Sequence, residues 1–208
     1  MNRRAKKVDK KTEQSRSHYN QLAQTYDSSA EGRYTLPFNQ YVCDHLPLAD
    51  KDAVLDVACG SGRLLRMLSR KACITACGID VSEEMIAAAQ NLYQEASFHI
   101  SPAETLCFSD DSFDYVTTCC AFHHFKWPDA FLREAYRVLK RNGKLVIADP
   151  SPAVVVRWLE NLIIPCMNTG DIRIYSAKEL YLFFHKAGFE SISHEKRNGM
   201  VLIQGTKK

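Results

Sequence analysis

The chain has 208 residues, of which 46% are hydrophobic and 25% are charged. This length and composition suit one domain with a core of useful size. The most apolar candidate for a membrane helix, residues 154–164, is interrupted by Arg157 and Glu160, and no apolar segment follows the N-terminal charges. We therefore expect no membrane-spanning helix, no signal peptide and a cytoplasmic location.

The net charge of +3 is unevenly distributed along the chain. Residues 1–11 contain six Lys or Arg side chains and one Asp, so the remainder is slightly negative. We interpret residues 1–11 as a flexible basic arm, either a solvated end or a segment that contacts nucleic acid. A slightly negative body disfavours a surface for phosphates, so we expect neither a nucleic-acid nor a membrane partner.

Cysteines are frequent but do not follow the spacing of a metal or disulfide framework. None forms a C-x-x-C pair, and Cys119 and Cys120 are adjacent. Small buried thiols in a reducing compartment account for them, so we expect no metal site. The eight cysteines occupy positions 43, 59, 73, 77, 107, 119, 120 and 166.

Hydrophobic periodicity predicts alternating strands and helices after two N-terminal helices. This alternation predicts a doubly wound, mostly parallel seven-stranded α/β sheet of Rossmann-like type, with a helical lid before it and an antiparallel hairpin at its end. In chain order, the expected elements are helices 12–27 and 34–46, strand 53–57, helix 61–70, strand 74–80, helix 82–91, strands 97–100 and 113–119, helix 129–139, strand 144–148, helix 176–186, and strands 189–194 and 200–205.

Local signals set several of these boundaries. Ser82 is placed as the N-cap of its helix, and Gly188 is placed just after the end of helix 176–186. The Arg-Asn-Gly run at 197–199 predicts the turn of the final hairpin. Residues 150–165 are the least regular and are expected to cover the site together with the N-terminal helices.

These boundaries define one domain over residues 12–208. We divide it into a helical lid at 12–50, a ligand-binding core at 51–150, and a cover segment, helix and terminal hairpin at 151–208.

The stretch Val-Leu-Asp-Val-Ala-Cys-Gly-Ser-Gly at 54–62 carries the main functional signal. Asp56 lies inside an apolar strand, where a carboxylate is costly unless it is paired, and Gly60 and Gly62 follow within six residues. Parallel sheets bind ligands where such a loop meets a helix N-terminus. We therefore expect a ligand site here.

Two of the ligand classes that use such loops fit poorly. The phosphate loop of nucleotide triphosphatases needs the run G-x-x-x-x-G-K-[ST], which the chain does not contain. The dinucleotide fingerprint needs a small third residue where the chain has Leu65, which obstructs close helix–strand packing around a pyrophosphate.

Residues 54–62 resemble the first motif, D-x-[AG]-x-G-x-G, of class I S-adenosylmethionine-dependent methyltransferases. Over about residues 17–150, the chain is similar to the small-molecule methyltransferases related to the ubiquinone and menaquinone biosynthesis enzymes. The resemblance implies S-adenosylmethionine as cofactor and a small-molecule methyl acceptor, with O, N or C methylation undecided.

The resemblance implies roles for the glycine loop and its acid. The loop, with Ala58, Gly60 and Gly62, would pass beneath the methionine part of the cofactor, and Asp56 would receive the ammonium group directly or through water. A tight turn accounts for the glycines as well, but not for an acid inside an apolar strand.

Further along, the resemblance implies contacts to the adenosine. Asp80 ends the second strand, where an acid can accept both ribose hydroxyls, and N-capping is its alternative. Val81 and Met85 would pack near the adenine.

The segment 101–114 resembles the family run G-D-A-E-x-L-P-F-x-D-x-S-F-D. Pro102 stands where the family has an acid, so the adenine edge loses that acceptor, and backbone contact through Ala103 and Glu104 remains. For Glu104, an acid on a loop is an equal alternative to a contact.

The strand over 113–119 delivers Cys119 into the expected cleft, and His123 and His124 resemble a His-His pair of this family. Histidine titrates in the range suited to a general base, so we expect one of the two to act when the acceptor must lose a proton. Packing at the strand–helix junction is the alternative for each.

The N-terminal segment resembles the family's lid helix. Tyr19 and Tyr26 are candidates for the positive sulfonium, which aromatic faces tolerate, and packing onto the sheet is the alternative. Arg33 resembles a position near the methionine carboxylate.

Three functions therefore remain open on the sequence. The first is a small-molecule methyltransferase. The second is a cofactor-binding protein of the same fold without transfer activity. The third is an NAD-dependent oxidoreductase, which Leu65 disfavours.

Overall fold

The computed structural model describes residues 10–208. The predicted basic arm at 1–11 lies outside these residues except for Lys10 and Lys11, which open the first helix. No helix within 10–208 is both long and apolar enough to cross a membrane.

A seven-stranded sheet lies at the centre of the fold, in the spatial order β3-β2-β1-β4-β5-β7-β6. The first five strands are parallel, and β7 runs antiparallel to both β5 and β6. The predicted fold class is therefore confirmed. The strands are β1 (Ala53–Val57), β2 (Thr75–Asp80), β3 (Ser97–Ile100), β4 (Phe113–Cys119), β5 (Leu139–Pro150), β6 (Glu190–Arg197) and β7 (Met200–Thr206).

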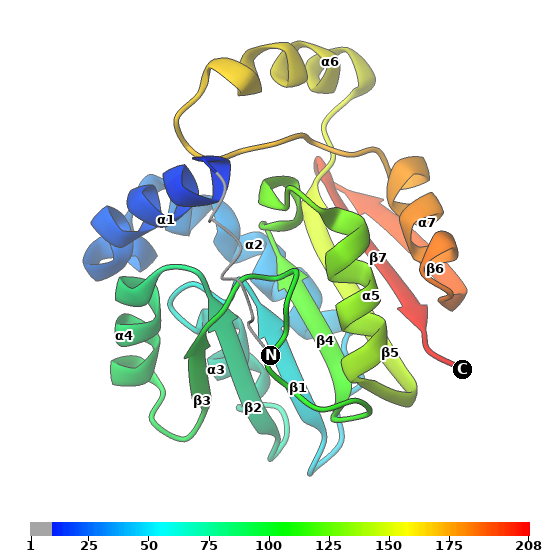
Figure 1. Ribbon diagram of the computed structural model, residues 1–208. Helices are drawn as coiled ribbons and strands as arrows, with labels where there is room; N and C mark the ends of the chain where they lie inside the picture. The colour runs from blue at the N-terminus through cyan, green and yellow to red at the C-terminus, as the bar shows by residue number, and fades with distance from the viewer. Residues whose placement is uncertain (1–9) are drawn as a thin grey trace, which may run out of the picture.

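Helices cover both faces of the sheet, as Figure 1 shows. Alternation along a strand sends successive side chains to opposite faces. In β1, Leu55 therefore joins the core under α5 and α7, whereas Val54 joins the core under α2, α3 and α4. The helices are α1 (Lys10–Leu22), η1 (Ala23–Ser28), α2 (Ala30–His45), α3 (Arg63–Leu68), α4 (Glu83–Leu92), η2 (Phe122–His124), α5 (Pro128–Val138), α6 (Val154–Ile163), η3 (Ile164–Cys166) and α7 (Ala177–Lys186).

The largest differences from the predicted boundaries occur at three elements. The first predicted helix ends at Leu22, and residues 23–28 form the 3-10 helix η1. The second begins at Ala30, earlier than predicted, because the Ser29 side chain accepts a hydrogen bond from the Gly32 N–H and caps it. The strand predicted over 144–148 is longer in the structure, spanning Leu139–Pro150.

The segment predicted to be least regular, residues 150–165, contains the helix α6. Not one residue of α6 is buried, and its apolar side chains include Trp158, which is 62% exposed. Figure 1 shows α6 set apart from the helices that cover the sheet. The apolar side chains of α6 recur at helical spacing, with Arg157, Glu160 and Asn161 on the opposite face, so this pattern did indicate a helix that the sequence analysis missed.

The capping and turn signals are confirmed. Ser82 caps α4 by accepting from the Met85 N–H at 3.0 Å. Gly188 directly follows the C-cap of α7 and has a φ of 92°, as a glycine just past a helix end requires. Asn198 and Gly199 both have positive φ, as the tight hairpin turn between β6 and β7 requires.

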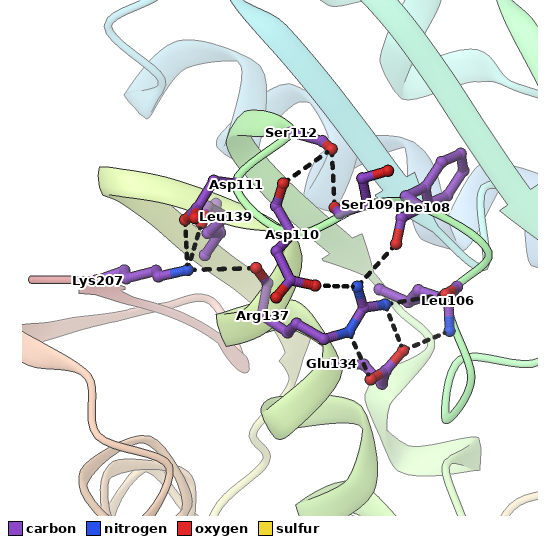
Figure 2. A network of polar contacts seen from close by, with 10 residues as sticks. All are labelled: Leu106, Phe108, Ser109, Asp110, Asp111, Ser112, Glu134, Arg137, Leu139 and Lys207. Atoms are coloured by element: carbon purple, nitrogen blue, oxygen red, sulfur yellow. Dashed lines mark hydrogen bonds and ion pairs between the residues drawn. The ribbon is translucent and has the colours of Figure 1, made fainter.

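An arginine on α5 fastens the loop that follows β3 (Figure 2). The Arg137 guanidinium donates to both carboxylate oxygens of Glu134, to Asp110 and to the carbonyls of Leu106 and Phe108, at 2.7–3.0 Å. These hydrogen bonds raise the pKa of Arg137 and lower that of Glu134. The planar guanidinium of Arg137 thus holds the loop against α5 with several N–H donors in fixed directions, an arrangement that a lysine ammonium group cannot provide.

We expect Arg137→Lys to lower the free energy of unfolding by about 1.5–3 kcal/mol, because hydrogen bonds to a charged partner are lost. For a chain of this size, the melting temperature falls by about 2–4 °C per kcal/mol. Thermal denaturation checks this value. Arg133→Lys changes an exposed arginine on the same helix and should have little effect, and an equal loss in both variants would contradict the role of Arg137.

Candidate functional site

The loop between β1 and α3 has the strained geometry that its glycines suggest. Ala58, Gly60 and Gly62 all have positive φ, between 53° and 73°. A Cβ atom on Gly62 would lie 2.9 Å from the ring of Phe98 and 3.2 Å from Ala89. Gly62 therefore allows α3 to pack closely on β3 and α4, and it does not face the groove described below.

Asp80 holds this loop from the end of β2. Its carboxylate is buried and accepts hydrogen bonds from the N–H groups of Gly60 and Ser82, both at 2.9 Å. Burial raises the pKa of Asp80, and these two hydrogen bonds oppose that rise. Since Ser82 itself caps α4, N-capping is not the task of Asp80. A carboxylate offers about four acceptor positions, so acceptors remain for further donors.

Asp56 is a buried carboxylate in the middle of the sheet. It is 2% exposed, and the Thr117 hydroxyl donates to it at 2.7 Å. Burial raises the pKa of Asp56 to about 7, with Thr117 acting in the opposite direction. Asp56 does not line the groove but lies two residues before Ala58, which does.

Most of the predicted cofactor-binding residues come together in one groove at the carboxyl ends of the strands. It brings together the predicted residues Tyr19, Tyr26, Ala58, Gly60, Asp80, Val81, Met85, Ala103, Glu104, Cys119 and His124. The predicted residues outside its lining are Arg33, Asp56, Gly62 and His123. The groove also includes residues that the sequence analysis missed, namely Thr12, Ser15, Ser101, Cys120, Ala121 and Phe125.

Some of the missed residues had a usable signal. Ser101 and Cys120 directly follow strands β3 and β4, and ligands bind where parallel strands end. No sequence signal marked Thr12 and Ser15, because their position in the groove depends on how α1 packs against the rest of the domain. Pro102 is exposed, whereas its neighbour Ala103 is buried in the groove wall.

The N-terminal elements close over the glycine loop through an ion pair. Arg63, the first residue of α3, is 8% exposed and contacts Asp27 at 2.6 Å. The Asp27 carboxylate also accepts from the Ser61 hydroxyl at 2.7 Å. Arg33, the arginine that the sequence analysis selected, instead donates to the Ser28 carbonyl and lines a second cavity.

Two tyrosines form an aromatic wall of the groove. The rings of Tyr19 and Tyr26 meet edge to face, with centroids 6.1 Å apart. Burial raises the pKa of Tyr26 to about 12, so it stays neutral and presents a phenol. The Tyr19 hydroxyl lies 3.2 Å from Nε2 of His124 and joins this wall to the histidine pair.

The second cavity has a volume of about 760 Å³ and lies on the other side of that pair. Its walls are mostly apolar and come from α2, α6, η3, the segment after η3 and the turn between β6 and β7. The polar and charged members are Arg33, His123, Glu160, Asp171 and Asn198. The apolar members include Tyr34, Pro37, Phe38, Pro150, Pro152, Ile163, Ile164, Met167, Ile174 and Met200.

His123 and His124 differ in protonation because their partners differ. Burial opposes protonation of His123, but Asp149, 2.9 Å from its Nδ1, and Asp171 together raise its pKa. Burial and the neighbouring His123 lower the pKa of His124 to about 3, so that ring is neutral.

The comparisons with known proteins agree with this geometry. Residues 55–147 match the family model described as "Methyltransferase domain". The chain is 31% identical over 180 residues to the Ubiquinone/menaquinone biosynthesis C-methyltransferase UbiE of Rickettsia felis, covering 72% of this chain and 73% of that protein.

A second relative is more similar over a shorter region. The chain is 39% identical over 108 residues to the Demethylmenaquinone methyltransferase of Thermotoga maritima, covering 51% of this chain and 47% of the relative. This match therefore spans about half the length of the relative.

A solved structure shares the fold. Phosphoethanolamine N-methyltransferase 2 of Haemonchus contortus, in complex with S-adenosyl-L-methionine, superposes with a TM-score of 0.73 at 14% identity, covering 91% of this chain and 60% of that chain. The chain thus belongs to the class I S-adenosylmethionine-dependent methyltransferases and is related to UbiE.

Proposed function

We propose that the protein transfers the methyl group to a small, largely apolar ring compound, such as a hydroxylated aromatic or quinone-type acceptor, held in the second cavity. One observation carries this proposal: the two cavities meet at adjacent residues, since His124 lines the groove and His123 lines the second cavity. Donor and acceptor would therefore meet at the histidine pair.

The residues present fit S-adenosylmethionine. Asp56 is a buried carboxylate whose high pKa reflects the cost of leaving it charged there, and an arriving ammonium group offsets that cost. We propose that Asp56 receives this ammonium group, near Ala58 and Gly60, and that Asp80 accepts the ribose hydroxyls.

Other residues that line the groove would contact the adenine and the sulfonium. Val81 and Met85 would flank the adenine, and Ala103 and Glu104 would meet its edge. Tyr19 and Tyr26, with Cys119 nearby, would face the sulfur, because neutral aromatic rings stabilise a positive charge. Arg33 and Gly62 lie outside this groove, so we assign them no contact with the cofactor.

The acceptor class follows from the second cavity. Its volume of about 760 Å³ lies within the usual range for small-molecule sites, roughly 300–1,000 Å³. Its walls suit an apolar ring, and the relatives named above are methyltransferases of ubiquinone and menaquinone biosynthesis. We therefore propose a ring carbon or ring oxygen as the methylated atom.

The chain's own residues would supply alignment, exclusion of water and a proton acceptor. Bound S-adenosylmethionine carries a methyl group that is already activated by a positive sulfur. Orientation in such a displacement is worth about 7–11 kcal/mol. His124, whose ring is neutral, would take the proton that a hydroxylated ring must lose, and Asp149 would hold His123 beside it.

We also propose that residues 12–50 serve as a lid over the core at 51–150, with 151–208 covering the acceptor. The ion pair of Arg63 with Asp27 supports this division, since it ties η1 to the glycine loop.

All eight cysteines are free thiols, which supports a reducing compartment such as the cytoplasm.

Calorimetry and turnover test the function in two steps. We expect the full chain to bind S-adenosylhomocysteine and not NADH, because Leu65 is fully buried where a dinucleotide site needs a small residue. With S-adenosylmethionine, we expect S-adenosylhomocysteine to form only when a hydroxylated ring compound is added. Binding without acceptor-dependent turnover would make the chain a binding protein.

A cavity-filling variant locates the acceptor. Ile174→Trp fills the second cavity and should raise KM for the acceptor while leaving the affinity for S-adenosylhomocysteine unchanged. Leu182→Trp places the same side chain at an exposed position of α7 and should alter neither. An unchanged KM in Ile174→Trp would place the acceptor elsewhere.

A further inference from the structure

We propose that His123, His124 and Asp171 bind one divalent metal ion of the Zn²⁺ class at the wall between the two cavities. The cysteine spacing predicts no metal site, and Asp171 is 47 residues from His124 along the chain, so no local motif indicates this cluster. The binding claim stands on its own, and only its consequence for the acceptor rests on the proposed function.

The distances between the three side chains match a shared ion. Nε2 of His123 and Nδ1 of His124 each lie 3.4 Å from the same oxygen, Oδ1 of Asp171. All three ligand atoms lie within 4.8 Å of one another. Two ligands about 2.0–2.1 Å from a tetrahedral ion are about 3.4 Å apart, whereas an N–H···O hydrogen bond is typically about 2.9 Å.

The atoms that would not bind the ion already have partners. Nδ1 of His123 lies 2.9 Å from Oδ1 of Asp149, which is 1% exposed, and Nε2 of His124 lies 3.2 Å from the Tyr19 hydroxyl. The Thr169 hydroxyl donates to Oδ2 of Asp171. A carboxylate on the far nitrogen of a ligating histidine is the usual second layer of a metal site.

One ligand atom is conspicuously unsatisfied. Nδ1 of His124 is buried, and no described residue lies in hydrogen-bond geometry with it, although Oδ1 of Asp171 is 3.4 Å away. Buried polar atoms of this kind are rare in folded proteins and call for an explanation. A metal ion at the common point of the three side chains satisfies this nitrogen.

The charge around the cluster also favours a cation. Two carboxylates, Asp149 and Asp171, face two imidazoles in a half-buried setting. Lys11 lies close by, but its ammonium group donates to the carbonyls of Ile164 and Met167 at 3.5 and 3.0 Å. A protonated histidine could supply the positive charge instead, and the experiment below separates the two.

The donor set indicates the metal and its use. Two imidazole nitrogens and one carboxylate oxygen suit Zn²⁺ or Fe²⁺ better than Mg²⁺ or Ca²⁺. Three protein ligands leave at least one position open, which is typical of catalytic rather than structural sites. Since His123 and Asp171 line the second cavity, a hydroxyl oxygen of the acceptor can take that position, where the ion would lower the pKa of the hydroxyl group. Its proton would then pass to solvent, because both imidazoles would hold the ion and neither would act as the base.

The test is a titration of the full chain with Co²⁺ and Zn²⁺ after chelator treatment. Exposed thiols also bind these metals, so Cys73, Cys107 and Cys166 are first changed to Ser. We expect one equivalent of Co²⁺ to bind with the visible absorption of a tetrahedral site and without sulfur-to-cobalt charge transfer, and Zn²⁺ to displace it.

Variants assign the ligands. Asp171→Asn and His124→Asn should abolish stoichiometric binding, and Asp149→Asn should weaken it about 10–100-fold as a loss of second-layer support. His194→Asn changes an exposed histidine on β6 and should bind as the parent does. Circular dichroism checks that each variant is folded.

Absence of binding, thiolate charge transfer, or binding that survives in Asp171→Asn would overturn the metal site and leave a charged hydrogen-bond network. Calorimetry with S-adenosylhomocysteine in the presence of chelator distinguishes failure of the metal site from failure of the proposed function. If that ligand binds and no metal does, the metal site fails alone. If the metal binds and S-adenosylhomocysteine does not, the proposed function fails alone.

Discussion

Asp56→Asn is expected to weaken the binding of S-adenosylmethionine by about 10–100-fold while making the free protein more stable above pH 7. Loss of a charge-assisted hydrogen bond to the ammonium group costs about 1.5–3 kcal/mol. Asparagine keeps the size of the side chain and can still accept from Thr117, which lies 2.7 Å from the carboxylate. The change therefore removes charge and little else.

The gain in stability follows from the direction of the pKa shift. Burial raises the pKa of Asp56 to about 7, compared with about 3.9 for an unfolded Asp. Between these values, the folded state binds more protons than the unfolded state, so stability falls as the pH rises. This contribution is complete below about pH 4 and is lost as the pH passes through 7. The asparagine variant does not undergo that loss.

Thermal denaturation from pH 4 to pH 8 measures the stability, and calorimetry with S-adenosylhomocysteine measures the affinity. The parent should lose affinity below pH 7, as Asp56 becomes protonated, and the variant should show no such dependence. Asp44→Asn makes the same chemical change at an exposed position and serves as the control. Parent-like affinity in Asp56→Asn would remove Asp56 from the cofactor site.

Gly32→Ala is expected to destabilise the protein, contrary to what helix propensity alone predicts. Gly32 lies in the first turn of α2, where alanine is intrinsically better than glycine by about 1 kcal/mol. A Cβ atom here would lie only 1.9 Å from the backbone oxygen of Tyr26. Since that neighbour is backbone, η1 must shift, and overpacking of this kind costs about 1–3 kcal/mol.

The displacement should also reach the groove. η1 carries Tyr26, which lines the groove, and Asp27, which pairs with Arg63. We expect a lower melting temperature together with weaker binding of S-adenosylhomocysteine. Gln40→Ala introduces alanine at an exposed position of the same helix and should be neutral or slightly stabilising. A higher melting temperature for Gly32→Ala would contradict this expectation, because it would mean that η1 shifts without loss of stability.

The sheet and the donor groove were predictable because their signals are local. The strands β1, β3 and β4 have the predicted bounds, since short apolar runs are bounded by turn residues. The carboxyl ends of parallel strands meet at one edge, so Ala58, Val81 and Cys119 had to come close together.

Other features depend on contacts between segments far apart in the chain. Arg63 and Arg33 have the same side chain, and only the docking of η1 against α3 makes Arg63 the one that is buried and paired with Asp27. The course of residues 164–176 likewise brings Asp171 to the histidine pair, and no periodicity reports a loop's position.

From the sequence alone, one could therefore derive the doubly wound sheet, the glycine loop and the acids that follow the strands, because strand–helix alternation and side-chain periodicity are local patterns. Tertiary structure decided which groups are buried together. Burial gives Asp56 its high pKa, sets the size of the second cavity, and gathers His123, His124 and Asp171, since each depends on how distant segments exclude water from one another.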